Sequence, residues 1–512
     1  MTDWIIVPTV LPAMTAALLV LAMRNSLAAQ RAISIAATAA LLAVAIGLYG
    51  LAADGVVRPY FVGNWPAPFG IVLVLDRLSA TMLMLTAALA LVVVLYAAAG
   101  WDTRGRHFHM LFQFQLLGIN GAFLTGDVFN LFVFFEVMLI ASYGLMLHGG
   151  GATRLKAGFQ YVAINLVAST LFLFAVGLIY AVTGTLNMAD LAVKAAAVAP
   201  ADAALLKTGA LLLFLVFAVK AALVPLHWWL PGTYAATSAP SAALFMIMTK
   251  VGAYAILRVH GQMFGAGDGA VSQAASALVM PAALVTLAAG AVGMLAARRL
   301  RDLICFAVVA SMGTLLVAVA AFDIGGTTAA LYYLVHSTLA GAALFLLADL
   351  VADRRGAWLD RLVPADALPR TMLFAALFFL AAIAMAGMPP LSGFIGKLMI
   401  LDATRGAPGW ATVWTVVLVA SLLMIVAFGR AGSTLFWKTG GMSTVDRGSE
   451  RRALLPLAMV GALLAGMAAM TAGAGPVAGA LEATARQALD SEGYVRAVLG
   501  PDARIRVAGG QP

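Results

Sequence analysis

Five ionisable side chains lie inside long apolar stretches of this sequence, where a charged group is costly. A charged residue at the centre of a bilayer costs about 2.5–3.5 kcal/mol on insertion scales, so each of them needs a reason to be there. A buried lysine can hold a proton when a carboxylate is near and release it when the carboxylate withdraws. The set therefore predicts stepwise proton transfer within a membrane. Its members are Glu136, Lys220, Lys250, His336 and Lys397.

Each of these residues also has a purely structural interpretation. Glu136 and one lysine could form an ion pair that fixes the register of two helices. Lys250 could extend its ammonium group towards the membrane surface, and His336 could be a neutral imidazole bonded to a neighbouring hydroxyl. One acid cannot neutralise three lysines, however, so pairing alone does not explain the whole set.

Prolines accompany two of the lysines. Lys220 is followed by Pro225, which cannot donate the hydrogen bond of a continuing helix, and Lys397 follows Pro389 and Pro390. The apolar run that contains Lys397 would be ~44 Å long as one straight helix, which is too long for a single span. Free carbonyl groups at membrane depth are tolerated only inside protein or along a wet cavity. We therefore predict two discontinuous helices; the alternative is an ordinary proline kink.

Composition defines the class of protein in which these residues act. Of 512 residues, 63% are hydrophobic and 10% are charged, whereas a soluble domain has about 25% charged residues. A soluble enzyme and a disordered chain are both excluded. The single cysteine excludes a disulfide framework and a cysteine-based metal site. We predict an all-α polytopic membrane protein with about fourteen transmembrane helices. They are expected at 3–23, 32–53, 78–100, 108–126, 128–147, 158–183, 205–230, 240–260, 276–297, 303–322, 327–349, 371–401, 409–433 and 453–473.

The order of these spans indicates an internal repeat. The two discontinuous helices are the seventh and the twelfth, so they cross the membrane in opposite directions, as in an inverted-topology repeat. Helices 4–8 would then mirror helices 9–13. The expected units are 1–107, with the first three helices; 108–262, the first repeat; 263–440, the second repeat; and 441–512, with the last helix and a tail.

Basic residues in the loops predict the orientation. Eighteen lysines and arginines fall in one set of loops and five in the opposite set, and the richer side should face the cytoplasm. Both termini are then extracytoplasmic. The tail after residue 476 could form a short interfacial helix or fray. The net charge of +9 does not indicate nucleic-acid binding, because it is spread over these short loops.

At the same five residues, the chain resembles a known family. It is similar to the antiporter-like membrane subunits of respiratory complex I, membrane-bound hydrogenases and the Mrp multisubunit cation/proton antiporters. Glu136 matches the glutamate of the family's fifth helix, and His336 the histidine of its eleventh. Lys220 precedes a Pro-Leu-His-Trp-Trp-Leu-Pro run, Lys250 opens a Lys-Val-Gly-Ala-Tyr-Ala-Ile-Leu-Arg run, and Lys397 follows Pro-Pro-Leu-Ser-Gly-Phe. The resemblance covers about residues 70–440.

Within the family, the Mrp branch is the most similar, above all its D-type subunits. The run at 125–143 and the Leu-Pro-Gly-Thr-Tyr run at 230–234 carry this likeness, and a lysine rather than a glutamate at position 397 argues against one complex I relative. The alternative is a proton-pumping membrane subunit of a redox-driven complex, either complex I or a membrane-bound hydrogenase. A third class is a membrane scaffold that transports nothing.

The resemblance implies a secondary transporter subunit rather than an enzyme. It implies a hetero-oligomer of membrane subunits in the lipid of a bacterial inner membrane, which exchanges Na⁺ or K⁺ for protons without a cofactor or a bound metal. Whether the cation crosses this chain stays open. Three polar residues are candidates by their chemistry alone, and helix packing explains them equally well. They are Asn165, Ser169 and Thr170.

Overall fold

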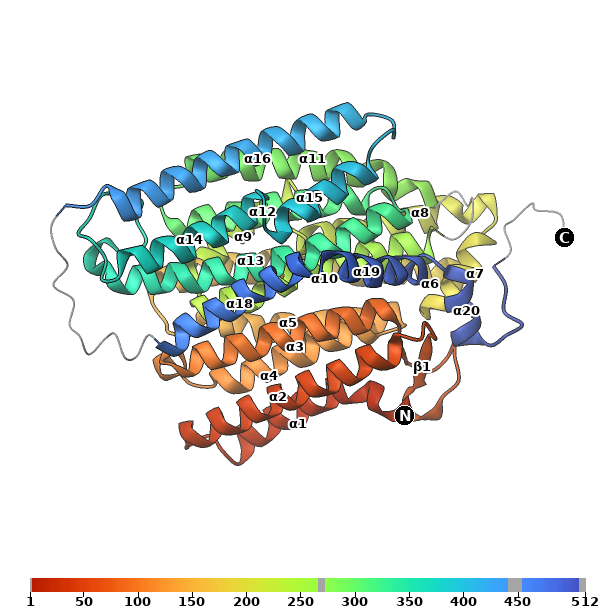
Figure 1. Cartoon of the computed structure of the whole chain (residues 1–512). Helices are drawn as coiled ribbons and strands as arrows, with labels where there is room; N and C mark the ends of the chain where they lie inside the picture. Colours follow the sequence, from red (N-terminus) through yellow and green to blue (C-terminus); the bar gives the residue numbers. More distant parts are fainter. Residues whose placement is uncertain (1, 266–271, 441–453, 506–512) are drawn as a thin grey trace.

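Helices form nearly all of this fold, and most of them run side by side along one direction (Figure 1). The computed structural model describes residues 2–265, 272–440 and 454–505. Within these ranges, twelve helices are long and apolar enough to cross a membrane. The chain is thus a polytopic helical membrane protein, as its composition predicts.

The first half of the chain runs from α1 to α10. Its helices are α1 (Val7–Leu21), α2 (Leu27–Ala52), α3 (Arg77–Ala98), α4 (Phe108–Leu124), α5 (Val128–Leu147), α6 (Ala152–Thr183), α7 (Met188–Ala196), α8 (Pro200–Lys220), α9 (Trp229–Ala236) and α10 (Ala239–Ala255). Short 3-10 segments lie at Thr2–Ile6, Val62–Asn64, Trp101–Arg104 and Leu226–Trp228, and a π-helical segment, η5 (Ile256–Met263), extends α10.

The second half runs from α11 to α20. Its helices are α11 (Ser272–Ala296), α12 (Leu300–Val319), α13 (Ile324–Arg354), α14 (Thr371–Ala386), α15 (Ser392–Ala403), α16 (Trp410–Gly432), α18 (Leu454–Ala472), α19 (Ala474–Ala488) and α20 (Ser491–Leu499). A 3-10 turn lies at Gly356–Trp358, and a π-helical segment, Ser433–Trp437, follows α16.

The count of fourteen spans is not confirmed, for two local reasons. The predicted fourth span forms α4, which has only 17 residues and carries Gln113, Gln115 and Asn120 among its apolar side chains. The predicted twelfth span is divided between α14 and α15, of 16 and 12 residues. In the described ranges, neither α4 nor the divided span is among the twelve long apolar helices.

Aspartates begin several of the membrane helices. The Asp76 carboxylate accepts the Ser79 backbone N–H at the start of α3, and the Ser79 hydroxyl accepts the Asp76 N–H in return. Asp127 and Asp323 accept backbone N–H groups at the first turns of α5 and α13. A carboxylate is favourable there because the first-turn N–H groups have no partner within the helix. These acids therefore set helix boundaries.

The helices differ strongly in burial, and this places the core. The most apolar stretch of the span Ala239–Met263 is 100% buried, and those of α12 and α13 are 89% buried. The corresponding stretches of α2 and α6 are only 28% and 33% buried, so these helices face outwards. Lys250 and His336 lie on α10 and α13. Two of the five ionisable residues therefore lie on the innermost helices of the bundle.

Two features at one end of the bundle go beyond the predicted spans. Strands β1 (Arg58–Phe61) and β2 (Val72–Leu75) form an antiparallel hairpin between α2 and α3, with Arg58 opposite Leu75. The tail forms α19 and α20, so it is helical rather than frayed. Tyr494 and Val495 of α20 are buried. In Figure 1, α1 begins and α20 lies at the same, right-hand end.

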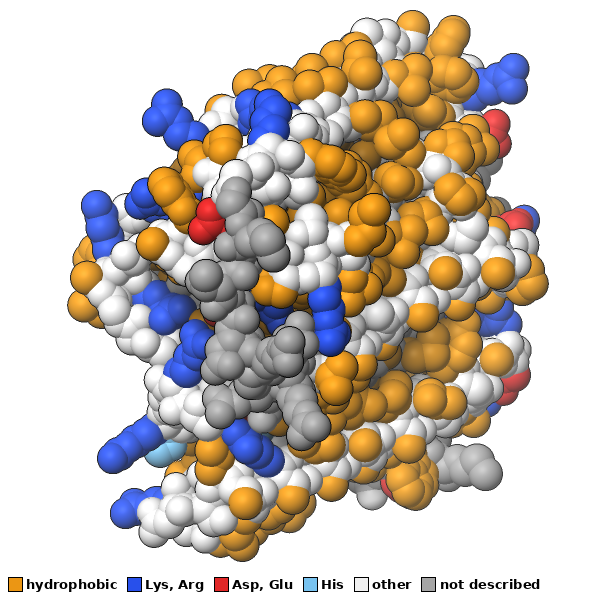
Figure 2. All heavy atoms as spheres, turned by 60° about the vertical axis from the view of Figure 1, so that its left-hand side comes forward, with side chains coloured by type: hydrophobic (Ala, Val, Ile, Leu, Met, Phe, Trp, Pro, Cys, Tyr) orange, Lys and Arg blue, Asp and Glu red, His pale blue; other side chains and the backbone are white. Residues whose placement is uncertain are grey.

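The surface is divided into an apolar flank and a basic end. Figure 2 shows hydrophobic side chains over most of the flank and Lys and Arg side chains gathered at the left-hand end of that view. This is the distribution expected when an apolar belt faces lipid and a basic end faces the cytoplasm.

Candidate functional site

Glu136 and Lys220 are connected through α6. The Ser169 hydroxyl donates a hydrogen bond of 2.5 Å to Oε1 of Glu136. One turn away on α6, the Asn165 side-chain oxygen accepts a hydrogen bond of 2.7 Å from Nζ of Lys220. Because residues four apart share one helix face, α6 presents both polar groups between α5 and α8. Ser169 and Asn165 are thus partners of the two charged groups, whereas Thr170 is exposed and bonds its own helix.

The sequence allows an ion pair between Glu136 and one lysine, but Glu136 and Lys220 do not form one directly. In the described ranges, neither residue forms a hydrogen bond or an ion pair with the other. Each charged group is instead bonded to a neutral polar group, Glu136 to a hydroxyl and Lys220 to an amide oxygen. Such neutral partners also compensate a charge for its loss of water on burial. Lys220 is 5% exposed, while Glu136 is only partly buried.

The chain leaves the helical conformation directly after Lys220. The helix α8 ends at Lys220, and α9 begins at Trp229. Within this interruption Ala222 has a φ of 54°, and the Trp229 indole N–H donates to the Val219 carbonyl. A Cβ at Gly252 of α10 would lie 2.7 Å from the Ala221 nitrogen. Only glycine allows α10, which carries Lys250, to approach the interruption so closely.

Lys250 lies in the centre of the bundle with very little polar compensation. It is 0% exposed, and within the described residues its Nζ forms one hydrogen bond, of 3.5 Å, to the sulfur of Met312 on α12. A thioether is a weak acceptor. The snorkelling interpretation therefore fails for this residue, because its ammonium group does not reach the surface.

His336 faces the start of α15. Its Nδ1 lies 2.9 Å from the Ser392 hydroxyl, while Nε2 is buried and has no hydrogen-bond partner among the described residues. A Cβ at Gly393 would lie 2.7 Å from that Nε2 and 2.0 Å from the Ala384 carbonyl oxygen. The hydroxyl partner fits the neutral-imidazole interpretation of His336.

Lys397 is held by the interruption between α14 and α15. Its Nζ donates hydrogen bonds of 2.8 Å to the Ala386 carbonyl and to the Ser421 hydroxyl of α16. Ala386 is the last residue of α14, so its carbonyl is free to accept. The described residues place no acidic side chain in an ion pair with Lys397. This agrees with the sequence, in which no midspan acid is available to it.

The helices that carry the five residues follow one another through the bundle. In sequence of contact, α5 packs on α6, α6 on α8, α8 on α10, α10 on α13, and α13 on α15. The structure therefore brings all five predicted side chains into one row of neighbouring helices. Between Lys220, Lys250, His336 and Lys397 there is no direct hydrogen bond in the described ranges.

Two further buried clusters were not predicted. Arg258 of η5 forms an ion pair of 2.6 Å with Asp76, and both side chains are almost fully buried. Asp349 of α13 accepts the Trp101 indole N–H at 2.6 Å and the Tyr96 hydroxyl at 2.9 Å. Asp76 and Asp349 lie at or near the ends of α3 and α13, where the sequence alone suggests that an acid caps a helix and is exposed. They are buried because other helices pack against these ends.

Three histidines outside the row differ in their exposure to solvent. A position at a helix end predicts a solvated His148, but this residue is 5% exposed, and its Nε2 lies 2.8 Å from the Trp101 carbonyl. Trp101 covers it, and burial lowers the pKa of His148. His107 is exposed. His227 is partly buried in the interruption between α8 and α9, beside the exposed Trp228.

Comparisons with known proteins agree on one family of membrane subunits. The sequence model of the family described as NADH:quinone oxidoreductase/Mrp antiporter, transmembrane, matches residues 125–425. The chain is 42% identical to the D-type subunit of a probable K(+)/H(+) antiporter from Rhizobium meliloti (strain 1021), over 95% of this chain and 96% of the relative. It is 35% identical to the D-type subunit of an Na(+)/H(+) antiporter from Bacillus subtilis (strain 168), over 98% of this chain and 100% of the relative.

Solved structures share the fold over nearly the whole length. A chain of the Mrp complex from Dietzia sp. DQ12-45-1b superposes with a TM-score of 0.86 at 29% identity, covering 98% of this chain and 100% of that one. A chain of respiratory complex I from Thermus thermophilus superposes with a TM-score of 0.74 at 25% identity, covering 94% and 99%.

Proposed function

The chain belongs to the NADH:quinone oxidoreductase/Mrp antiporter transmembrane family, and from this premise we propose that it carries protons in a multisubunit monovalent cation/proton antiporter. The cation is Na⁺ or K⁺, since relatives named for either ion are similar to this chain. The chain would act as a subunit of a secondary transporter. Energy would come from ion gradients and the membrane potential.

One observation carries this proposal: five ionisable side chains lie on successive packed helices, at two interruptions and in the core between them. Protons would move between Glu136, Lys220, Lys250, His336 and Lys397, with water bridging the gaps. A lysine whose partners are neutral can lose its proton without leaving an unpaired carboxylate behind. The interruptions after Lys220 and between α14 and α15 would admit that water.

The partial exposure of Glu136 suggests that another subunit contacts α5. It is only partly buried, and its neighbours on the outer face, Val133 and Ile140, are 38% and 65% exposed. A carboxylate at membrane depth is unfavourable against lipid. We therefore place another membrane subunit of the hetero-oligomer over this face of α5. In the proposal the assembly lies in a bacterial plasma membrane with both termini outside.

The repeat is part of the proposal as well. Residues 108–262 and 263–440 would be related by inverted topology. Lys220 would then stand beside the interruption that contains Pro225, and Lys397 beside the one that contains Pro389 and Pro390. Support comes from the two interruptions, each of which has a buried lysine at its edge: Lys220 is the last residue of α8, and Lys397 donates to the carbonyl of Ala386, the last residue of α14. Alternating access would then need small movements of one repeat against the other around these lysines.

The test is antiport in vesicles that contain the assembled complex. We expect Glu136→Ala or Lys220→Ala to abolish cation-dependent proton movement while the subunit still inserts and assembles. Lys207→Ala is the matched control, because Lys207 lies on the same helix as Lys220 but is exposed. Near-normal antiport in either relay variant would contradict the proposal.

Copurification separates this function from its alternatives. We expect small membrane subunits of an antiporter to purify with the chain, and neither flavin nor iron–sulfur subunits. Peripheral redox subunits in the purified complex would instead indicate a proton-pumping membrane subunit, the second function that the likeness to complex I allows. A chain that purifies alone and tolerates apolar replacements at the relay would be a scaffold.

A further inference from the structure

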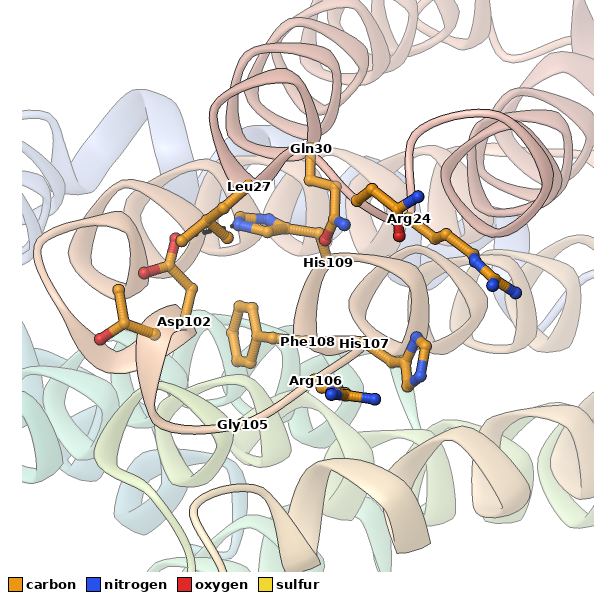
Figure 3. Close-up of a pocket in the computed structure, with 11 residues that line it drawn as sticks. Arg24, Leu27, Gln30, Asp102, Gly105, Arg106, His107, Phe108 and His109 are labelled. Atoms are coloured by element: carbon orange, nitrogen blue, oxygen red, sulfur yellow. Dashed lines mark hydrogen bonds and ion pairs between the residues drawn. The ribbon is translucent and has the colours of Figure 1, made fainter.

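A polar cavity of about 520 Å³ lies at the basic end of the molecule, outside the row of relay residues. The turn between α1 and α2, the 3-10 segment after α3 and the start of α4 form its walls (Figure 3). In that view Arg24, Arg106 and His107 lie towards the right of the cavity, and Asp102 lies at its left. The relay helices α8, α10, α13 and α15 contribute no lining residue.

The net charge of the cavity is positive. Arg24 and Arg106 are exposed, and neither forms an ion pair within the described part of the chain. The one acid of the lining, Asp102, is already neutralised: Arg31 donates to both of its oxygens, at 2.5 and 2.7 Å, and His109 Nε2 lies 3.1 Å from Oδ2. Burial opposes ionisation of Asp102, yet its hydrogen bonds with Arg31 and His109 lower its pKa to about 2. Two guanidinium groups therefore remain for a ligand.

The first turn of α4 adds uncommitted donors. The helix starts at Phe108 after His107, which forms no side-chain cap, and the N–H groups of Phe108, His109 and Met110 make no hydrogen bond in the described ranges. Such N–H groups and the positive end of the helix dipole favour an anion.

His109 lies on the same wall of the cavity, and its ring lies between Gln30 and Asp102 (Figure 3). The side chain is 0% exposed, and Nε2 lies 3.1 Å from Asp102, which keeps this acid engaged on the protein side of the wall.

We propose that this cavity binds the phosphate group of an anionic phospholipid from the leaflet on the basic side. Arg24 and Arg106 would hold the phosphate oxygens, and the α4 N-terminus would face the same charge. The exposed apolar side chains Met14, Leu18 and Leu21 of α1 run from this end of the helix along the membrane flank. They provide a surface for the acyl chains, which a free phosphate ion would not use.

Lipid titration of the purified, delipidated complex tests this site. Nanodiscs of phosphatidylcholine would be titrated with phosphatidylglycerol, and tightly bound lipid counted by native mass spectrometry. We expect Arg24→Gln together with Arg106→Gln to weaken phosphatidylglycerol binding about tenfold or more, since each basic group at a membrane surface contributes to binding an anionic lipid. Both residues are exposed, so the fold should persist.

The control removes the same charge elsewhere on the basic side. Lys156→Gln together with Lys438→Gln changes two exposed residues that do not line the cavity, and it should leave the tight site intact. Equal phosphatidylglycerol binding by the cavity variant and the wild type would overturn the site. Displacement of the lipid by millimolar inorganic phosphate would overturn the lipid as its occupant. Neither result depends on antiport, so failure here leaves the proposed function untouched.

Discussion

The three buried lysines have very different partners. Lys220 bonds an amide oxygen, Lys397 bonds a backbone carbonyl and a hydroxyl, and Lys250 bonds only a sulfur atom among the described residues. Because an ammonium group needs good acceptors to remain charged in a protein interior, Lys250 has the least support for its charge. It is thus the lysine of the row whose ammonium group has the weakest hydrogen-bond acceptor.

Asn165 should matter as much as the charged residues that it joins. Replacing it with alanine removes the oxygen that Lys220 bonds and the link towards Ser169 and Glu136. A hydrogen bond to a charged group contributes about 1.5–3 kcal/mol, so we expect Asn165→Ala to slow antiport about tenfold or more. Initial rates of cation-dependent proton movement in vesicles measure this. Thr170→Ala, an exposed neighbour on α6, should be near normal, and equal rates in the two variants would contradict the role of Asn165.

Lys250 tests whether a changing protonation state is needed. Arginine keeps its proton in proteins, so Lys250→Arg retains the charge but prevents release. We expect loss of exchange in the vesicle assay, with normal assembly of the complex. The matched change Lys207→Arg, on the exposed face of α8, should have no effect. Full activity of Lys250→Arg would mean that a fixed positive charge is sufficient at this position.

The ionisable residues of the row are visible in the sequence, but their partners are not. Glu136, Lys220, Lys250, His336 and Lys397 were predictable, because charged and imidazole groups within apolar runs are rare. Asn165 and Ser169 could be suggested only by chemistry, since neutral polar residues are common in membrane helices. The Ala386 carbonyl and the Met312 sulfur carry no sequence signal, and only packing assigns them to a lysine.

At the scale of helices, glycine allows the close contacts around the second interruption. Gly393 lies in the first turn of α15, against the Ala384 carbonyl and the His336 ring. At its position a Cβ would lie 2.0 Å from that backbone oxygen, so α14 and α15 would have to separate. This contact joins the element that holds Lys397 to the one that holds His336.

We therefore expect Gly393→Ala to impair antiport severely and to lower the thermal stability of the purified complex. The free energy of overpacking is about 1–3 kcal/mol when neighbouring backbone must shift. Gly429→Ala, in α16, is the control, because a Cβ there meets no atom within 4 Å. Antiport and melting temperature would be measured for both. If the two variants behaved alike, the close contact at Gly393 would not be needed.

The length of apolar runs predicted most elements but not all of them. The spans of α5, α10 and α13 follow from uninterrupted apolar sequence, and the latter two are also the most buried of the three. The β1–β2 hairpin escaped prediction because its strands have four residues each and include Pro59. The α4 span is more polar than expected, and two of its polar side chains bond neighbouring helices: Gln113 donates to Ser34 of α2, and Asn120 donates to Pro8 of α1.

At the scale of the whole molecule, the distribution of basic residues predicts which end faces the cytoplasm. Eighteen basic residues lie in one set of loops and five in the other, and such a bias sets the orientation of membrane proteins. The basic end lies at the left in Figure 2, and the start of α1 and the helix α20 lie at the opposite, right-hand end in Figure 1, as expected if the basic end faces the cytoplasm and α1 begins outside. The direction of proton transfer and the leaflet of the lipid site both depend on this orientation.

Single cysteines can test the orientation directly. The natural Cys305 is 0% exposed, so the unchanged protein should not react with a membrane-impermeant maleimide. Ala407→Cys lies in the exposed turn between α15 and α16, on the side with few basic residues, and Thr103→Cys lies in the exposed segment between α3 and α4 on the basic side. In intact cells we expect only the cysteine at position 407 to be labelled, and the one at 103 to react after the membrane is permeabilised. The reverse pattern would invert the molecule, because α1 begins and α20 lies at the same end of the bundle, opposite the basic end. It would place the Arg24–Arg106 cavity in the outer leaflet and reverse the side from which each lysine exchanges its proton.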